Sequence, residues 1–332
     1  MLELQYLIFT VIILALVFDF INGFHDTANA IATSVSTRAL QPNHAIMMAA
    51  VLNFLGAMVS TGVAKTIGGD IVSSASIVDE KIIIAALFGA IVWNLLTWYF
   101  GIPSSSSHAL VGGLIGAVLI SVGASGLNWN GIGKIVVSLI ASPVIAIVTG
   151  IIIMNILFRL FGNFSPHTVN DKFRKMQVIS AATMAFSHGS NDAQKSMGII
   201  TLALFSGGFI PEFEVPMYVK ILCALAMAIG TATGGWRIIK TIGGKIFKLE
   251  PISGFAADLN SSVVVFGATL LHLPVSTTHV VSGSIMGVGT AKRVNAVHWG
   301  VAQQMVKAWV MTIPITAAMG AGAFALVNLI FR

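Results

Sequence analysis

Charged residues are scarce in this chain. Asp, Glu, Lys and Arg make up only 9% of its 332 residues, whereas 56% are hydrophobic. A soluble domain of ordinary composition carries about 25% charged residues, so these few charges cannot cover a water-facing surface of this size. The composition therefore excludes an ordinary soluble protein and indicates a protein that lies within a lipid bilayer.

Cysteine is almost absent, and the first apolar stretch lacks the features of a signal peptide. The single cysteine, Cys223, excludes a framework of intrachain disulfides and is expected to be a small packing residue. Glu3 rather than Lys or Arg precedes the first apolar stretch, which is therefore expected to be a retained helix. The formal net charge of +6 is attributed to loops that obey the positive-inside rule, and no binding of nucleic acid is predicted.

Long apolar stretches are the most prominent feature that is present. A helix needs about 20 apolar residues to span the hydrocarbon of a bilayer. The sequence therefore predicts a helical membrane protein that crosses the bilayer several times. Stretches close to that length occupy residues 4–21, 45–64, 82–100, 133–158 and 215–235.

Two polar motifs occur twice, in the same order. "NGFHDTANAIA" at 22–32 corresponds to "HGSNDAQKSMG" at 188–198, and "PSSSSH" at 103–108 corresponds to "PVSTTH" at 274–279. Duplicated halves with polar, Gly- or Pro-interrupted segments are typical of secondary transporters, whose halves are often related by an axis in the membrane plane. We predict an all-α polytopic membrane protein with two inverted-topology repeats, broken helices or helical hairpins, and roughly 10–12 membrane segments.

The repeat also predicts how the chain is divided. A first transmembrane repeat is expected over residues 1–162, a linker loop over 163–176 and a second transmembrane repeat over 177–332. Basic residues such as Lys172 and Arg174 place the linker in the cytoplasm. If each repeat crosses an odd number of times, both termini lie on the extracytoplasmic side of the cell (inner) membrane.

The aspartate motif groups oxygen-bearing side chains. Asn22, Asp26 and Asn29 share one face of a helix, and Gly23 and Gly189 are expected to let the two helices loosen and free carbonyl oxygens. Sites of carboxylates, amides and carbonyls suit hard cations, so sodium fits and so does a proton. Simple pairing of Asp26 with a basic side chain is the structural alternative. The candidate cation ligands are Asn22, Asp26, Asn29, Asn191, Asp192 and Gln194.

The serine- and threonine-rich motifs are predicted to begin helices. In both, a proline precedes small hydroxyl residues and an apolar run follows, which is typical of an N-cap. A helix N-terminus presents free N–H groups and a partial positive charge, and these bind phosphate readily. Plain N-capping without a ligand is the structural alternative. The candidate phosphate-binding residues are Ser105, Ser106, Ser107, Ser276, Thr277, Thr278 and Lys195.

The charges of these groups suggest how such a site would work. Two aspartates and a phosphate place roughly three to four negative charges in a dry region. Lys195, which either contacts the anion or neutralises an aspartate, offsets part of this charge, and bound cations would supply the rest. Anion binding would then depend on cation binding. His108 and His279, one turn inside the two helix starts, are expected to have a supporting role.

These motifs resemble those of the inorganic phosphate transporter (PiT) family. "GFHDTANAIAT" and "HGSNDAQKSMGI" are similar to its two signature segments, and "GIPSSSSHALVGGLIG" and "LPVSTTHVVSGSIMGVG" to its paired serine/threonine stretches; "GFAADLNSS" at 254–262 also matches. The resemblance implies cation ligands at Asp26, Asn29, Asn191 and Asp192. It implies an inverted-repeat homodimer in the lipid bilayer that carries inorganic phosphate together with sodium ions or protons. No cofactor is expected beyond co-transported sodium ions, with protons as the alternative.

Alternatives remain within and outside this family. Its members are known to use protons with metal–phosphate complexes, or to carry sulfate, and a passive anion channel is a further possibility. Intramembrane aspartates would repel anions in a channel, whereas they make sense as cation sites in a symporter. An intramembrane protease is disfavoured, because Ser125 in "GASG" has no counterpart in the second half. We therefore predict a secondary active transporter that imports phosphate by alternating access, with no catalytic residues.

Overall fold

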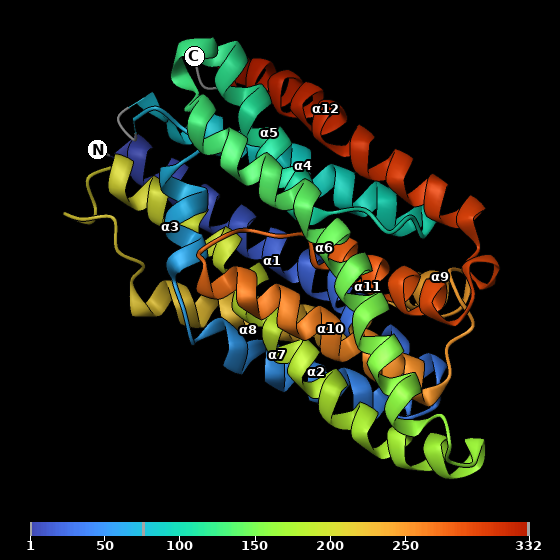
Figure 1. Cartoon of the computed structure of the whole chain (residues 1–332). Helices are drawn as coiled ribbons and strands as arrows, with labels where there is room; N and C mark the ends of the chain where they lie inside the picture. Colours follow the sequence, from blue (N-terminus) through green and yellow to red (C-terminus); the bar gives the residue numbers. More distant parts are fainter. Residues whose placement is uncertain (1, 75–76, 331–332) are drawn as a thin grey trace.

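Helices make up all the regular elements of the computed structural model over the residues that it describes, 2–74 and 77–330 (Figure 1). The first six α-helices are α1 (Leu2–Ser36), α2 (Pro42–Ala57), α3 (Gly62–Gly69), α4 (Glu80–Phe100), α5 (Ser106–Ser121) and α6 (Trp129–Phe161). The next six are α7 (Pro166–Ser206), α8 (Met217–Thr233), α9 (Trp236–Gly244), α10 (Pro251–Leu270), α11 (Thr277–Lys292) and α12 (Trp299–Ile330).

The two sets of helices follow the same plan. Each set begins with its longest helix, continues with a helix of 16 or 17 residues and a short one of 8 or 9, and ends with a helix of 33 or 32 residues. Packing crosses between the sets: α5 lies against α12 and α11 against α6, while α1 lies against α8 and α7 against α2. Each half of the chain therefore packs mainly through the other half.

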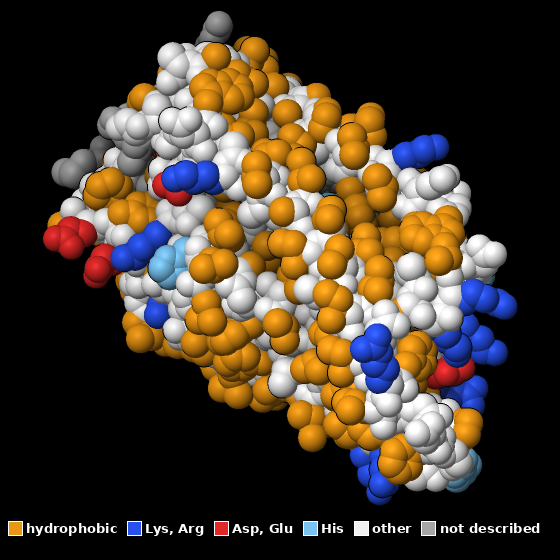
Figure 2. Space-filling model, in the orientation of Figure 1, with side chains coloured by type: hydrophobic (Ala, Val, Ile, Leu, Met, Phe, Trp, Pro, Cys, Tyr) orange, Lys and Arg blue, Asp and Glu red, His pale blue; other side chains and the backbone are white. Residues whose placement is uncertain are grey.

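Several helices are long and apolar enough to cross a bilayer. Within the described part of the chain these are α1, α4, α6 and α12. The pair α2 and α3 is long and apolar enough only when taken together, and it is bent by 72° at its break, as in a broken span or a re-entrant loop. Hydrophobic side chains cover the middle of the visible face, and charged side chains gather toward its ends (Figure 2). The predicted multi-pass helical protein is confirmed, but the apolar stretch at 45–64 is divided between α2 and α3 rather than being one straight helix.

The linker between the halves is shorter than expected. The sequence predicted a loop over 163–176, whereas α7 already begins at Pro166. Ser165 is its N-cap and accepts a hydrogen bond from the backbone N–H of Thr168 at 3.3 Å, and proline suits the first helical position. The basic residues therefore lie on the first turns of α7, and only the short segment between Phe161 and Pro166 connects the halves.

The glycines of the aspartate motif bring helices together instead of loosening them. Both α1 and α7 are continuous through the motif, so the expectation of loosened helices with freed carbonyls is wrong for this structure. A Cβ atom at Gly23 would lie 2.4 Å from the carbonyl oxygen of Met227, and one at Gly189 would lie 2.2 Å from that of Asn53. Only glycine permits these close approaches to α8 and α2.

Candidate functional site

Both hydroxyl-rich motifs lie at helix starts, as their sequences predict. Ser105 is the N-cap of α5 and accepts a hydrogen bond from the backbone N–H of His108 at 3.2 Å. Ser276 is the N-cap of α11 and accepts one from His279 at 3.3 Å. Each cap uses one hydroxyl, so the remaining hydroxyls of the two starts are available for other contacts.

These two helix starts meet at Asp26, in the C-terminal third of α1. The hydroxyl of Ser106 donates to Oδ2 of Asp26 at 2.7 Å, and that of Thr278 donates to Oδ1 at 3.1 Å. Nδ1 of His25 lies 2.8 Å from the same Oδ1. Because Asp26 is only 2% exposed, these polar groups replace the water that its carboxylate would otherwise bind.

Asp192 on α7 is the centre of a second set of polar contacts. Nζ of Lys195 lies 2.8 Å from its Oδ1, and the amide of Asn22 donates to its Oδ2 at 3.4 Å. Thr277 of the second helix start reaches the same Oδ2 at 3.5 Å. Lys195 also donates to the carbonyl of Val275 at 3.2 Å. Lys195 therefore neutralises an aspartate in this structure, which is one of the two roles expected for it.

The two motifs meet because α1 and α7 pack antiparallel. Asn22 contacts Asp192. Fifteen residues later, just past the end of α1, the hydroxyl of Thr37 donates at 2.6 Å to Oε1 of Gln177, which lies fifteen residues before Asp192 on α7. The amide of Asn29 completes the face by donating to the hydroxyl of Thr278 at 2.8 Å. Asn22, Asp26 and Asn29 thus face a single polar cluster, as their spacing predicts.

Three other candidate residues have contacts away from the two aspartates. Asn191 donates to Thr269 at 3.0 Å, and its Oδ1 accepts from the backbone N–H of Val275 at 3.3 Å. Oε1 of Gln194 accepts from the backbone N–H of Val63 at 2.8 Å, at the start of α3. Ser107 donates to the carbonyl of Val275 at 3.0 Å. These three side chains fix the surrounding backbone in this structure.

The polar cluster retains free oxygen atoms. Oδ1 of Asn22 and Oδ1 of Asn29 are buried and have no hydrogen-bond partner among the described residues. Amide and carboxylate oxygens suit hard cations such as sodium. Within the same described ranges, no three His, Cys, Asp or Glu side chains are grouped to hold a metal ion. The cluster therefore suits a cation bound by amide, hydroxyl and carboxylate oxygens.

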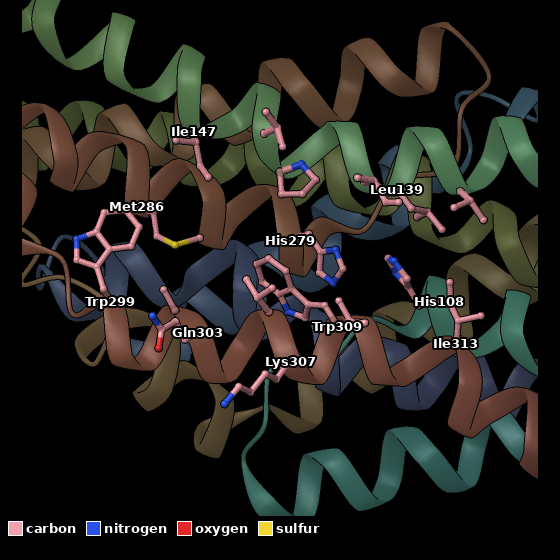
Figure 3. Close-up of a pocket in the computed structure, with 17 residues that line it drawn as sticks. His108, Leu139, Ile147, His279, Met286, Trp299, Gln303, Lys307, Trp309 and Ile313 are labelled. Carbon is pink, nitrogen blue, oxygen red and sulfur yellow. The ribbon is translucent and has the colours of Figure 1, made fainter.

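His108 and His279 lie behind the helix starts, in a separate apolar hollow of about 680 Å³ between α6, α11 and α12. Their rings point into it (Figure 3), with centroids 4.5 Å apart, and His279 stacks on Trp309 at 4.0 Å. Nδ1 of His108 lies 2.8 Å from the capping hydroxyl of Ser105. The two histidines thus contact the supporting structure of the helix starts and not the aspartates.

Sequence analysis missed two carboxylates that are almost completely buried. Asp19 on α1 and Asp258 on α10 are at most 1% exposed. Asp258 accepts a hydrogen bond from Thr33, whereas neither oxygen of Asp19 has a hydrogen-bond partner in the described parts of the chain. The signal was present, because Asp19 lies within the apolar stretch at 4–21 and an acidic residue there is rare in a membrane helix.

Comparison with known proteins identifies the family. The sequence model described as "Phosphate transporter family" matches residues 22–320. A "probable low-affinity inorganic phosphate transporter" of Bacillus subtilis (strain 168) is 53% identical over 97% of this chain and 97% of its own length. A protein of the same description from Rhizobium meliloti (strain 1021) is 49% identical over 93% of both chains.

A solved structure shares the fold. It is described as "the sodium-dependent phosphate transporter", has a TM-score of 0.89 and 26% sequence identity, and the match covers 98% of this chain and all of that one. Together with the family match over 22–320 and the relative that is 53% identical, this confirms the PiT resemblance. The chain belongs to the phosphate transporter family and is a multi-pass membrane transporter, not an enzyme.

Proposed function

We propose that this protein imports inorganic phosphate by symport with sodium ions, through alternating access to the site around Asp26 and Asp192. One observation carries the proposal: the two hydroxyl-rich helix starts converge on Asp26, through Ser106 at 2.7 Å and Thr278 at 3.1 Å. Two helix N-termini thereby direct backbone N–H groups and hydroxyls at one buried region, and this combination binds a tetrahedral oxyanion well.

Charge balance supports the coupling of phosphate to cations. The site has two buried carboxylates and one ammonium group, because Lys195 pairs with Asp192 at 2.8 Å. A phosphate that enters adds at least one further negative charge in a region of low dielectric constant. Sodium ions on the free amide oxygens of Asn22 and Asn29 would restore the balance, so each ion strengthens the binding of the other.

Sodium is proposed over the proton for this central site because of the available ligands. Carboxylate, amide and hydroxyl oxygens surround one region, and hard cations are bound by such oxygen sets. The solved structure that shares the fold is itself described as sodium-dependent. We further propose that the two halves are inverted repeats, because α1 and α7 begin corresponding sets of helices and run antiparallel.

The same proposal includes an orientation in the cell membrane. The basic first turns of α7 would face the cytoplasm, and both chain ends lie at the opposite end of the bundle (Figure 1). A cysteine placed at Asn163 of the Cys223→Ser protein should then react with an impermeant maleimide only in inside-out vesicles. Labelling of Asn163→Cys in intact cells would reverse the proposed orientation.

The transport proposal is tested by radiolabelled phosphate uptake into proteoliposomes. An inward sodium gradient, an inward proton gradient and no gradient are compared, each with and without excess sulfate. We expect accumulation above equilibrium with the sodium gradient, and no inhibition by sulfate. Equilibration without accumulation under every gradient would indicate a passive channel. Accumulation with the proton gradient alone would mean that protons, and not sodium ions, are the coupling ions.

The site is tested separately by Asp26→Asn and Asp192→Asn, which keep the size of each side chain and remove its charge. Asp171→Asn is the matched control, because Asp171 lies on the exposed first turns of α7. We expect both buried variants to lose sodium-driven accumulation and the control to retain it. Full accumulation by both buried variants would contradict the proposed cation site.

A further inference from the structure

We propose that Asp19 is a proton-binding site of the transport cycle, separate from the cation site at Asp26 and Asp192. The inference rests on the proposed phosphate transport by that central site. Asp19 lies on α1 about two helical turns before Asp26, at a distance of roughly 10 Å along the helix axis. It is completely buried.

Few groups around Asp19 can stabilise an ionised carboxylate. Neither carboxylate oxygen has a hydrogen-bond partner among the residues described. The titratable groups that face it are Asp192 and Lys195 from α7 and Cys223 from α8. Lys195 is already paired with Asp192 at 2.8 Å, and the thiol of Cys223 is uncharged. An ionised carboxylate in such a place is strongly disfavoured unless it is paired, so Asp19 is neutral in this conformation.

Two other buried carboxylates, Asp26 and Asp258, show the contrast. Asp26 is contacted by Ser106, Thr278 and His25, and Asp258 accepts from Thr33. Each of these carboxylates has at least one group that stabilises its charged form. Asp19 has no hydrogen-bond partner within the described residues. Only the Ser196 hydroxyl, the Cys223 thiol and the already paired Lys195 favour its charged form, and this poor set singles it out as the carboxylate that holds a proton.

The ligand count favours a proton over a metal cation at this position. Ser196 on α7 is the neighbouring hydroxyl, and its Oγ is buried without a hydrogen-bond partner in the described structure. One carboxylate and one hydroxyl are far fewer than the roughly six to eight oxygen ligands of a hard cation such as calcium. A proton needs only one carboxylate oxygen, and the Ser196 hydroxyl can pass it on.

The position of Asp19 couples this proton to phosphate. Ser196 follows Asp192 by one turn of α7, so Asp19 adjoins the central cluster through that helix. A negative charge roughly 10 Å from a bound anion, at an effective dielectric constant of about 20, weakens anion binding about tenfold. Protonation of Asp19 therefore strengthens phosphate binding about tenfold, and bound phosphate strengthens proton binding equally. The proton would enter from the side on which phosphate binds and leave where it is released.

The test compares wild type, Asp19→Asn and the control Asp171→Asn. Phosphate KM for sodium-driven uptake is measured from mildly acidic to mildly alkaline pH. At each pH all three proteins are exposed to the same mixture of phosphate ions. The effect of phosphate protonation on KM therefore cancels when the KM values of two proteins are divided. We expect KM of wild type and of Asp171→Asn to rise about tenfold relative to that of Asp19→Asn as the pH increases. A constant ratio between wild type and Asp19→Asn would overturn the proposal.

A second measurement covers the case in which Asp19→Asn does not transport. Infrared spectra of the purified proteins show the C=O stretching band of protonated carboxyl groups, and the spectrum of each variant is subtracted from that of wild type. We expect wild type to show a band that Asp19→Asn lacks and Asp171→Asn retains; identical spectra of wild type and Asp19→Asn would overturn the proposal. If wild type fails to accumulate phosphate under any gradient, the proposed function fails, while this spectrum still decides whether Asp19 binds a proton.

Discussion

The indole nitrogen of Trp309 on α12 donates a hydrogen bond to the carbonyl oxygen of Pro103, 3.2 Å away. The hydroxyl of Ser138 on α6 does the same for the carbonyl oxygen of Pro274, at 2.8 Å. Each proline opens one of the hydroxyl-rich motifs. Each helix start is therefore held by the last long helix of the opposite half, which fixes where its hydroxyls lie.

Replacing Trp309 with Phe should weaken phosphate binding. The change keeps an aromatic ring against His279 but removes the hydrogen bond to Pro103, which is worth about 1 kcal/mol, or about fivefold in affinity. We expect phosphate KM in proteoliposomes to rise by up to that factor. Trp129→Phe is the control, since it removes an exposed indole-to-carbonyl bond of equal length at Ala124. An equal rise in both variants would argue against a positioning role.

Ser106→Ala should reduce sodium-driven uptake more strongly. Its hydroxyl donates to the Asp26 carboxylate at 2.7 Å, and a hydrogen bond to a charged group contributes about 1.5–3 kcal/mol. Uptake at low phosphate concentration should fall roughly tenfold or more. Ser206→Ala, which removes a hydroxyl bonded only to a carbonyl of its own helix, should leave uptake unchanged. Normal uptake by Ser106→Ala would exclude this hydroxyl from the site.

Lys195→Met should destabilise the protein, because it leaves the Asp192 carboxylate buried without its cation at 2.8 Å. Breaking such a pair from one side costs about 3–5 kcal/mol. Adding Asp192→Asn should restore part of the lost melting temperature in detergent, since no unpaired charge then remains.

An exposed ion pair provides the control for the Lys195→Met and Asp192→Asn variants. Lys292→Met removes the exposed partner of Glu250 and should change stability by less than about 1 kcal/mol. If the double variant Lys195→Met/Asp192→Asn is no more stable than Lys195→Met alone, the pair does not neutralise a buried charge.

Gly189→Ala tests the close contact between α7 and α2. The added Cβ would lie 2.2 Å from the carbonyl oxygen of Asn53 and 2.6 Å from its Cα atom, so the helices must move apart. Overpacking of this kind costs about 1–3 kcal/mol, and the melting temperature in detergent should fall. Gly322→Ala on α12, where an added Cβ meets nothing within 4 Å, should not lower it.

Local sequence signals were enough to place the helix starts and the face that carries Asn22, Asp26 and Asn29. Proline followed by hydroxyl residues predicts an N-cap, and both predicted starts are present at Ser105 and Ser276. The spacing of Asn22, Asp26 and Asn29 predicts that they share one helix face, and all three side chains contact the central cluster.

What the sequence could not provide is which groups meet across the fold. Gln194 lies in the aspartate motif but binds the backbone of α3, and only tertiary packing decides that contact. The glycines were interpreted as flexible points because their neighbours in α2 and α8 are distant in the chain. Asp19 and Asp258 were missed because neither belongs to a motif that recurs in both halves, although each is a carboxylate in an apolar setting.

The interlocking of the two halves also has a consequence for how the protein is made. Asn29 and its partner Thr278 are separated by 249 residues, and a ribosome adds about 5–20 residues per second. The first helix must therefore wait roughly 12 to 50 seconds for the residues that satisfy its polar face. During that interval Asp19, Asp26 and Asn29 have to be sheltered by the insertion machinery or by water at the membrane surface, and assembly is completed only when the last helices arrive.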